Sequence, residues 1–463
     1  MNLKPSDILK LEHASAFNFE SINVRSFKGV STDSRTVKAG ELFFALRGEK
    51  FDGHKFVIDA FKAGAACAVV DIFADRREYL NKPVLIVQNS TKAFGSLASL
   101  YREKFQIPII AIAGSNGKTS TKEMTAKVLG TKYKVLSTAG NLNNQIGVPQ
   151  TLFRLRSKHE VAVVEIGTNH FGEIKYLCDI LHPTHGLITN IGSEHLEFFK
   201  NTKGVARAEG ELFDYLKDKL KAFVNADEEF ILKKADKIND KIFFGFNVSA
   251  VNVFGKMNSI DATGCATFKV KPSKKNEFSV KLSVPGIHTM KNALAAATIG
   301  LEFGVSEAKI ARALNQFRSV NKRTEVLKFR SVTIINDTYN ANSDSMVSAF
   351  ETIEAIRCKG KKILILGDML ELGNSSISEH KKVGKAIAQS KCDYLLTYGK
   401  MSKYIHENSS VKMKYHYNQK NVLAEFAVEL ISKGDLILVK GSRGMKMEDV
   451  VIFLSERLKR GRL

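Results

Sequence analysis

Several features that mark other classes of protein are missing from this 463-residue sequence. No apolar run approaches the ~20 residues that a membrane span needs, and no apolar core of a signal peptide follows the first residues. The five cysteines are scattered without a C-x-x-C pair, which indicates reduced thiols and no zinc site. We therefore expect a cytoplasmic protein without a membrane span.

Motifs of protein kinases and of nucleic-acid-binding proteins are also lacking. No HRD or DFG arrangement is present, which argues against a protein kinase. The net charge of +22 is large, but its lysines are spread along the chain and no nucleic-acid motif accompanies them. We interpret this charge as a basic, solvated surface that favours phosphate-bearing small molecules, rather than as a nucleic-acid site.

The order of apolar segments predicts an α/β fold with three domains. Residues 1–105 contain short strands and a helix, which indicates a small N-terminal α/β domain. Residues 106–325 alternate strands with helices, as in a doubly wound parallel sheet, with a small antiparallel patch at 240–285. Residues 326–463 repeat the strand–helix alternation without a G-x-G-x-x-G motif, which predicts a Rossmann-like C-terminal domain.

One stretch in the central region has the context of a phosphate-binding loop. The apolar residues 107–112 predict a strand, and residues 122–129 predict a helix. Between them lie the residues of the loop, Gly114, Ser115, Asn116, Gly117, Lys118, Thr119 and Ser120. Backbone N–H groups of such a loop bind phosphate, its lysine reaches the terminal phosphates of ATP, and its threonine binds Mg²⁺. The usual pattern has glycine at position 112, where this sequence has Ile112. A variant loop is the favoured interpretation, and an ordinary strand-to-helix turn is the alternative.

Two further polar side chains follow predicted strands of the same domain. Glu165 lies near the end of the predicted strand 161–167, and His195 follows the predicted strand 186–192. The carboxyl ends of parallel strands meet at one edge of a sheet, so both are expected near the loop. Thr119 and Glu165 supply oxygen ligands for Mg²⁺, and His195 is a further ligand or a hydrogen-bond donor to the transition state. A strand-end ion pair for Glu165 and a structural role for His195 are the alternatives.

Polar loop residues also gather in the N-terminal region. Ser34, Arg35, the backbone at Gly48, and His54 lie on segments that are rich in turn residues. Such groups are able to bind a sugar or a diphosphate. A turn-rich connector explains the same pattern equally well, so both interpretations stay open at this point.

Taken together, seven segments resemble the Mur ligase family, ATP-dependent enzymes that extend the peptide of bacterial cell-wall precursors. The segments that carry this resemblance are residues 113–119, 141–149, 165–170, 189–195, 337–343, 366–373 and 440–443. Within the family, N-L-N-N-Q-I-G-V-P at 141–149 is similar to the member that adds D-alanyl-D-alanine. The paralogue that adds the third residue is expected to have threonines and T-T-P there.

The resemblance implies a reaction and assigns one substrate to each of three domains, 1–105, 106–325 and 326–463. ATP with Mg²⁺ would phosphorylate the terminal carboxylate of UDP-N-acetylmuramoyl-tripeptide, and D-alanyl-D-alanine would attack the acyl phosphate. The N-terminal domain would hold the UDP-sugar, the central domain ATP, and the C-terminal domain the dipeptide. A monomer is implied. Whether the tripeptide ends in diaminopimelate or lysine stays open.

The same resemblance assigns roles to individual residues. The catalytic set is Lys118, Glu165, His195 and Glu209, and the metal ligands are Thr119, Glu165 and His195. Besides the loop, ATP would contact His288, Asn292, Arg323 and Asp337. Asn143 and Asn144 would contact the UDP-sugar together with Ser34, Arg35, Gly48 and His54. The residues that would contact the dipeptide and form the C-terminal part of the site are Tyr339, Asn340, Asn342, Ser442 and Arg443.

Position 209 departs from the family pattern. The family usually has a lysine there, within A-K-G-E, that is carbamylated to make an anionic group. This chain has Glu209 instead, and no lysine lies elsewhere in residues 204–213. Because glutamate is already a carboxylate, we predict that it supplies the charge without carbon dioxide. A solvated helix residue with the carbamate role lost is the alternative.

Two other functions compete with this interpretation. An amide ligase of the folate-polyglutamate type belongs to the same family, but the N-terminal region and residues 141–149 speak against it. A non-catalytic nucleotide-binding scaffold is the second alternative. The presence of Lys118, Thr119, Glu165 and His195 speaks against that scaffold, and ATP hydrolysis that depends on both substrates would exclude it.

Overall fold

A computed structural model describes residues 1–48, 51–74, 79, 81–217 and 220–460, which fall into two compact units. The first unit contains residues 1–111, 133–168 and 172–185, and the second contains residues 112–132, 169–171 and 186–463. The division passes through strands β8 (Ile109–Ala113) and β11 (His185–Ile188), so each of these strands contributes to both units.

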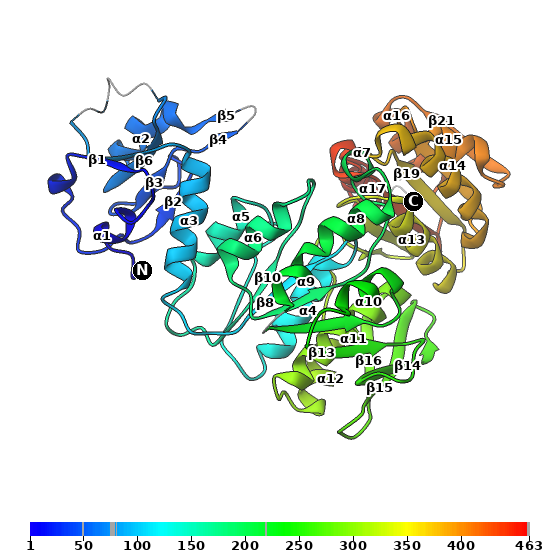
Figure 1. The fold of residues 1–463 in the computed structure, drawn as a ribbon. Coiled ribbons are helices and arrows are strands. Elements are labelled where there is room, and N and C mark those ends of the chain that lie inside the picture. Colours follow the sequence, from blue (N-terminus) through cyan, green and yellow to red (C-terminus); the bar gives the residue numbers. More distant parts are fainter. Residues whose placement is uncertain (49–50, 75–78, 80, 218–219, 461–463) are drawn as a thin grey trace. The chain divides into compact units, whose positions relative to one another are not determined.

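The first unit is built on a five-stranded sheet with the order β1-β7-β6-β3-β2 (Figure 1). Strand β1 is antiparallel to β7, and the other neighbours are parallel. The central strands are short apolar runs whose side chains are buried on both faces. The strands of this sheet are β1 (Ser15–Phe17), β2 (Val30–Ser31), β3 (Leu42–Phe44), β6 (Cys67–Asp71) and β7 (Val84–Val87).

Helix α3 (Ser90–Arg102) joins this sheet to the rest of the first unit. It begins at the cap Asn89, whose side chain accepts a hydrogen bond from the Lys92 N–H at 2.8 Å. Its buried Tyr101 donates its hydroxyl to the Leu155 carbonyl at 2.9 Å. The remaining elements are α1 (Pro5–Ile8), β4 (Arg47–Gly48), β5 (Phe51–Asp52), α2 (Val57–Lys62), β9 (Val135–Ser137), α5 (Gly147–Leu152), β10 (Val161–Glu165) and α6 (Glu173–Leu181).

The second unit begins with the loop region and contains strands β12 to β16. Strands β12, β13 and β14 are parallel neighbours, whereas β14, β15 and β16 are antiparallel, as the alternating pattern at 240–285 predicts. The elements are α4 (Lys118–Leu129), α7 (Leu196–Phe199), α8 (Thr202–Glu209), α9 (Glu211–Leu216), β12 (Lys221–Asn225), α10 (Glu229–Ala235), β13 (Asp240–Gly245), β14 (Val253–Ile260), β15 (Cys265–Pro272), β16 (Phe278–Pro285), α11 (Ile287–Glu302) and α12 (Glu307–Asn315).

The second unit also holds a six-stranded sheet with the order β17-β18-β22-β19-β20-β21. Only β17 runs antiparallel to its neighbour among these strands. The elements are β17 (Glu325–Phe329), β18 (Val332–Asp337), α13 (Ser343–Ala355), β19 (Lys362–Gly367), α14 (Ser376–Ala386), β20 (Tyr394–Tyr398), α15 (Lys403–Asn408), β21 (Met413–Tyr417), α16 (Lys420–Leu430), β22 (Leu436–Lys440) and α17 (Glu448–Lys459).

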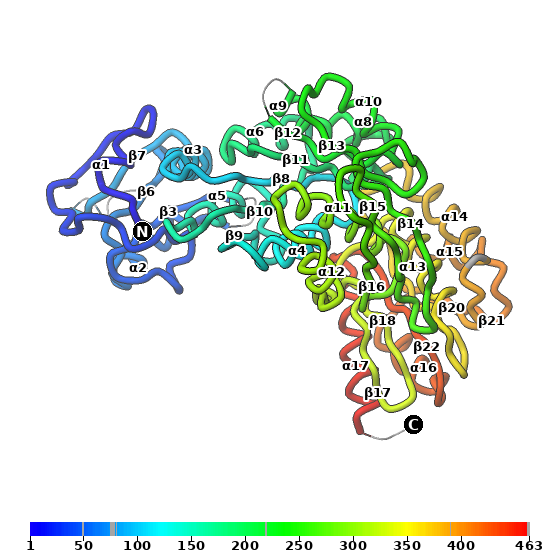
Figure 2. The backbone as a smooth tube through the Cα atoms, turned by 90° about the horizontal axis from the view of Figure 1, so that it is seen from below, coloured from blue at the N-terminus to red at the C-terminus, as the bar shows by residue number. Residues whose placement is uncertain are grey.

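Helices cover both faces of this six-stranded sheet, because successive strand residues point to opposite sides. Leu364 and Leu366 pack against α13, α14 and α15 on one face. Ile363 and Ile365 pack against α16 and α17 on the other. Figure 2 shows α17 alongside β17 and β18. The arrangement is the doubly wound α/β architecture that the sequence predicts for the C-terminal region.

Two boundaries differ from the sequence prediction. Helix α4 begins at Lys118 rather than Lys122, because Gly117 adopts a left-handed conformation and turns the chain directly into the helix. Strand β11 ends at Ile188, so residues 189–192, among them the polar Thr189 and Asn190, lie beyond it and are available to the loop. Within the described part of the chain, no helix is long and apolar enough to cross a membrane.

Candidate active site

The phosphate-binding loop joins β8 to α4, and glycine is required at two of its positions. Gly114 and Gly117 have φ angles of +116° and +81°, which side chains rarely adopt. A Cβ atom at Gly114 would come within 2.8 Å of the Thr189 backbone nitrogen. One at Gly117 would come within 2.5 Å of the Asn292 side chain, which places this predicted ATP contact directly against the loop.

Lys118 folds back over the loop that precedes it. Its ammonium donates to the carbonyl of Gly114 and, at 3.4 Å, to that of Ser115. The same nitrogen stands 3.6 Å from the Glu194 carboxylate, and the lysine side chain is 15% exposed. The cation is therefore held at the position where a loop of this kind places terminal phosphates.

The side chains of the loop are braced by neighbouring segments of the second unit. Asn116 donates its N–H to the Asn190 side chain at 3.0 Å, and its carbonyl accepts from that side chain at 2.8 Å. The Asn342 amide donates to the Asn116 side chain at 3.1 Å. The Ser115 hydroxyl accepts the N–H of Gly192 at 2.8 Å. Ser115 and Asn116 thus have internal partners that fix the shape of the loop.

Glu209, at the end of α8, lies fully buried beneath the loop. Its Oε2 accepts the N–H of Gly114 at 2.7 Å, and its Oε1 has no hydrogen-bond partner among the described residues. Burial raises the pKa of Glu209 to about 8; the nearby Lys118 opposes this increase and Glu194 adds to it. The interpretation of Glu209 as a solvated helix residue is therefore wrong.

Two predicted magnesium ligands carry oxygens that the described residues leave without a hydrogen bond. The Thr119 hydroxyl, in the second unit, is one of these buried atoms. In the first unit, Glu165 is 1% exposed; its Oε1 accepts from the Asn143 amide at 2.8 Å, and its Oε2 is the second such atom. Buried oxygens need partners, and oxygen is the donor that Mg²⁺ prefers, so each residue suits that ion. No cluster of three His, Cys, Asp or Glu residues that could hold a metal occurs in the described part of the chain.

His195 pairs with a residue that follows β19. Its Nδ1 stands 2.6 Å from the Glu371 carboxylate and its Nε2 stands 3.9 Å from Glu194. Burial lowers the pKa of His195, but Glu371 and Glu194 outweigh burial and raise it above the usual value. His195 and Glu371 both have positive φ angles, 48° and 62°. Strain of this kind in two paired residues is typical of functional sites.

The residues predicted to meet ATP at the domain junction form a connected group. Asp337 makes a 2.5 Å ion pair with Lys440 and accepts the N–H of Thr324 at 2.9 Å. The His288 Nε2 lies 3.4 Å from the Thr324 hydroxyl, and its Nδ1 is buried without a hydrogen bond among the described residues. Both Asp337 oxygens thus have protein partners, so we interpret Asp337 as fixing the junction.

Two arginines gather on Tyr339 beside this junction. The guanidinium carbons of Arg323 and Arg443 lie 3.7 and 5.4 Å from the centre of its ring. Arg443 also donates to the Tyr339 hydroxyl at 3.3 Å, and its backbone N–H meets the Asn340 side chain at 3.4 Å. The Ser442 hydroxyl is internal, because it bonds the Ala341 carbonyl at 3.1 Å. The arginines are the groups here that suit an anionic ligand.

The residues predicted to contact the UDP-sugar differ in their exposure. Arg35 is exposed and pairs with Asp33 at 2.7 Å in the turn that also holds Ser34, and Gly48 lies in the β4–β5 hairpin. His54 is buried instead: its Nδ1 meets Asp52 at 2.6 Å, and its Nε2 accepts the N–H of Asp71 at 2.9 Å. Its ring therefore ties the hairpin to β6.

The asparagine pair in residues 141–149 is likewise engaged within the first unit. Asn143 holds Glu165, as described above, and the Asn144 side chain accepts the N–H of Gly147 at 2.9 Å. Sequence reasoning missed Glu194, Asn190 and Glu371 as partners of the loop and of His195. Glu194 and Asn190 follow β11 directly, so their position after a strand was the available signal.

Models of known families match most of the chain. The Mur ligase middle domain matches residues 112–300, and the glutamate ligase domain of Mur ligases matches residues 322–443. The Mur ligase family catalytic domain matches residues 26–102. The chain belongs to the Mur ligase family. The three-domain Mur ligase fold predicted from the sequence is confirmed.

Curated and solved Mur ligases are similar over nearly the whole length. UDP-N-acetylmuramoyl-tripeptide–D-alanyl-D-alanine ligases of Bacillus subtilis and Escherichia coli are 36% and 37% identical, each over 92% of this chain and 93% of the relative. The crystal structure of MurF from Acinetobacter baumannii has a TM-score of 0.90 at 29% identity and covers 98% of this chain and 99% of that one. MurF ligase from Thermotoga maritima, in complex with ADP, has a TM-score of 0.81 at 25% identity, over 93% and 98%.

Proposed function

We propose that this chain is an ATP-dependent ligase that joins D-alanyl-D-alanine to UDP-N-acetylmuramoyl-tripeptide in peptidoglycan precursor synthesis. The observation that carries the proposal is the loop geometry: Lys118 is poised over Gly114 beside the buried Glu209. The similarity to curated ligases of this specificity over 92% of the chain supports the choice of substrates. ATP dependence follows from the family.

The proposed reaction proceeds in two steps. An oxygen of the terminal tripeptide carboxylate attacks the γ-phosphorus of ATP, ADP leaves, and an acyl phosphate forms. The dipeptide amine then attacks the acyl carbon, a tetrahedral intermediate forms, and phosphate leaves as the amide is made. Lys118 would neutralise charge on the transferred phosphoryl group, and the Gly114–Gly117 loop would orient it.

Thr119, Glu165 and His195 would hold Mg²⁺. When bound, this ion neutralises the negative charge that the phosphates bring together. The Thr119 hydroxyl and the Glu165 Oε2 are two of the buried oxygens that have no hydrogen bond among the described residues. His195 would bind through Nε2, because its Nδ1 is paired with Glu371.

We also propose that Glu209 replaces the modified lysine of other family members. Its Oε2 fixes the Gly114 N–H, and its carboxyl group faces Lys118 and Glu194. Once ionised, glutamate provides this anionic group without carbamylation, so the enzyme would need no carbon dioxide. Its stem is shorter than that of a carbamylated lysine, and a water would fill the remaining distance.

Substrate contacts are assigned by position. Arg323 and Arg443 suit the anionic groups of ATP and the dipeptide, with Tyr339, Asn340, Asn342 and Ser442 shaping that region. His288, Asn292 and Asp337 would line the ATP site. Ser34, Arg35 and Gly48 would contact the UDP-sugar directly, whereas His54, Asn143 and Asn144 would position the loops that do. Domains at 1–105, 106–325 and 326–463, a monomeric state and a cytoplasmic location complete the proposal.

Isotope transfer tests the proposed reaction. With ¹⁸O in both oxygens of the terminal tripeptide carboxylate, an acyl phosphate passes one labelled oxygen to the released phosphate. Mass spectrometry should therefore find one ¹⁸O in each phosphate molecule and one in the product amide. Unlabelled phosphate would exclude an acyl phosphate. Amide formation with a folate substrate in place of the UDP-sugar would favour the folate-polyglutamate type of ligase instead.

A further inference from the structure

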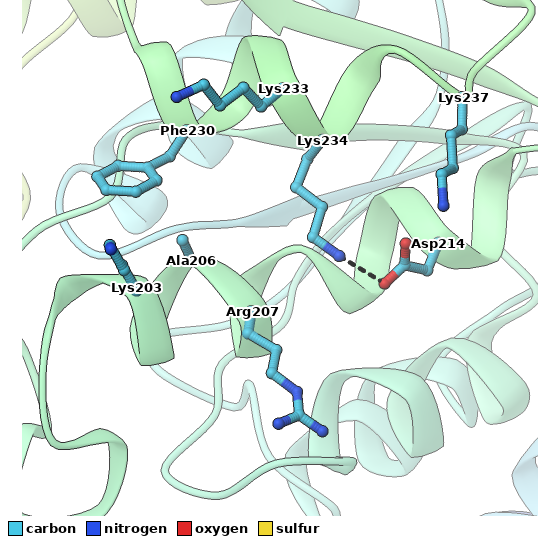
Figure 3. Close-up of a pocket in the computed structure, with 8 residues that line it drawn as sticks. All are labelled: Lys203, Ala206, Arg207, Asp214, Phe230, Lys233, Lys234 and Lys237. Carbon is cyan, nitrogen blue, oxygen red and sulfur yellow. Dashed lines mark hydrogen bonds and ion pairs between the residues drawn. The ribbon is translucent and has the colours of Figure 1, made fainter.

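A basic pocket of about 350 Å³ lies between α8, α9 and α10 of the second unit (Figure 3). Its charged lining residues are Lys203, Arg207, Lys233, Lys234, Lys237 and Asp214. None of them belongs to the loop, the proposed metal ligands or the proposed substrate contacts. Five cationic side chains and a single carboxylate thus line one hollow of the central region.

The positive charge of this pocket is only partly compensated. Lys234 pairs with Asp214 at 2.8 Å, and Lys233 pairs with Glu229 at 2.5 Å. Among the described residues, no carboxylate lies within ion-pair distance of Lys203, Arg207 or Lys237. Cations gathered at one concave surface focus a positive potential, which attracts a multiply charged anion more strongly than scattered lysines do.

Two of the cationic groups are held in place by the fold. The Lys234 stem crosses Gly210, where a Cβ atom would come within 2.6 Å of the lysine Cε. The guanidinium carbon of Arg207 stands 4.9 Å from the centre of the Phe171 ring. Side chains that are already ordered lose less conformational entropy when a ligand binds. The site is therefore partly formed before any ligand arrives.

We propose that this pocket is a second anion site, separate from the ATP loop, for a small molecule that carries a diphosphate. A diphosphate brings several negative charges to three uncompensated cations, and the volume lies within the range of small-molecule sites. Phe230 adds an apolar wall on α10. The chemistry required of the ligand is that of an inorganic or organic diphosphate.

Helix α8 connects this pocket to the active site. Lys203 and Arg207 are four residues apart, so they share the helix face that lines the pocket. The Glu209 side chain projects from the opposite side of α8 and accepts the N–H of Gly114 at 2.7 Å. An anion that binds Lys203 and Arg207 would therefore act on the helix that holds Glu209 under the loop. We infer that the bound anion changes the KM for ATP, an inference that rests on the proposed function.

Calorimetric titration with inorganic pyrophosphate tests the site. The titration uses Lys118→Ala as background, so that binding at the ATP loop is weakened. Adding K203E/K237E to that background should weaken pyrophosphate binding by about tenfold or more, because two attractive charges become repulsive. K203Q/K237Q, which only removes the charges, should give a smaller loss. K412E/K433E makes the same change of charge at two exposed lysines elsewhere and should leave binding unchanged.

The outcomes separate the site from its coupling to catalysis. Absence of binding at millimolar pyrophosphate, or equal binding by the K203E/K237E protein, would overturn the site. In the enzyme with Lys118 intact, competition at the loop raises the KM for ATP in both proteins, so coupling should appear as a pyrophosphate-dependent KM shift of different size in the wild type and in K203E/K237E. Binding with no such difference would refute the coupling through α8. Failure of the ligase assay itself would leave the calorimetric result standing, because that result does not depend on turnover.

Discussion

Substitution of Glu209 addresses the feature in which this chain departs from its family. Glu209→Ala removes the acceptor of the Gly114 N–H, which would then be buried without a partner at a cost of roughly 1–3 kcal/mol. Glu209→Gln keeps an acceptor oxygen there but removes the negative charge beside Lys118. If the charge matters, both variants should lose most of their turnover. If only the hydrogen bond matters, Glu209→Gln should stay active.

The pH dependence of kcat/KM tests the charge of Glu209 independently. Because the pKa of Glu209 is raised to about 8, its carboxylate forms only as the pH rises through that value in the free protein. The kcat/KM of the wild type should therefore rise toward pH 8, since this parameter reports groups of the free enzyme. Glu209→Gln should lack that increase.

Phosphate release measures turnover in these experiments, and circular dichroism with thermal unfolding checks the fold. Glu407→Gln, a change at an exposed helix residue, is the matched control and should be neutral. Added bicarbonate should restore neither Glu209 variant. Full activity in Glu209→Ala, or clear bicarbonate dependence of the wild type, would refute the reasoning.

Four further predictions follow from the same geometry. Lys118→Ala should remove most phosphate release without changing the circular dichroism spectrum, and near-normal turnover would reject its role. EDTA should stop phosphate release, because Thr119 and Glu165 would lose their ion; activity in EDTA would exclude this site. Asp337→Asn should lower stability toward urea by about 3 kcal/mol, because Lys440 would be left buried and unpaired. Although burial raises the pKa of Asp337, Lys440 outweighs it and lowers that pKa below 3.8, so the wild-type advantage should disappear as the pH falls below 3.8. Asn342→Ala removes the cap of α13 and should cost about 1 kcal/mol in the same titration; an unchanged midpoint would contradict that role.

The strands were the part of the fold most accessible from sequence. Residues 161–164 are an apolar run and residues 332–335 are β-branched, and these segments form most of β10 and of β18. The loop was recognisable because a strand, two glycines and Lys118 occur in a fixed order. Short pairings such as β4 with β5 were not predicted, because their two-residue strands carry no periodicity.

The partners within the site were harder to predict. Glu371 is 176 residues from His195 in the sequence, and only the folded chain places their side chains 2.6 Å apart. His54 looked like a ligand contact because it lies among turn residues, yet its ring is buried between two carboxyl-bearing residues. Sequence spacing locates a residue on an element, whereas the direction of its side chain depends on packing.

The central claim is that ATP cleavage at this loop is coupled to amide formation between two particular substrates. The most direct measurement is phosphate release with each UDP-N-acetylmuramoyl-tripeptide, ending in diaminopimelate or in lysine, with and without D-alanyl-D-alanine. The account predicts rapid release only when ATP, one of these tripeptides and the dipeptide are all present, with one amide formed per phosphate. Release at the same rate without the dipeptide, or none with any combination, would contradict it.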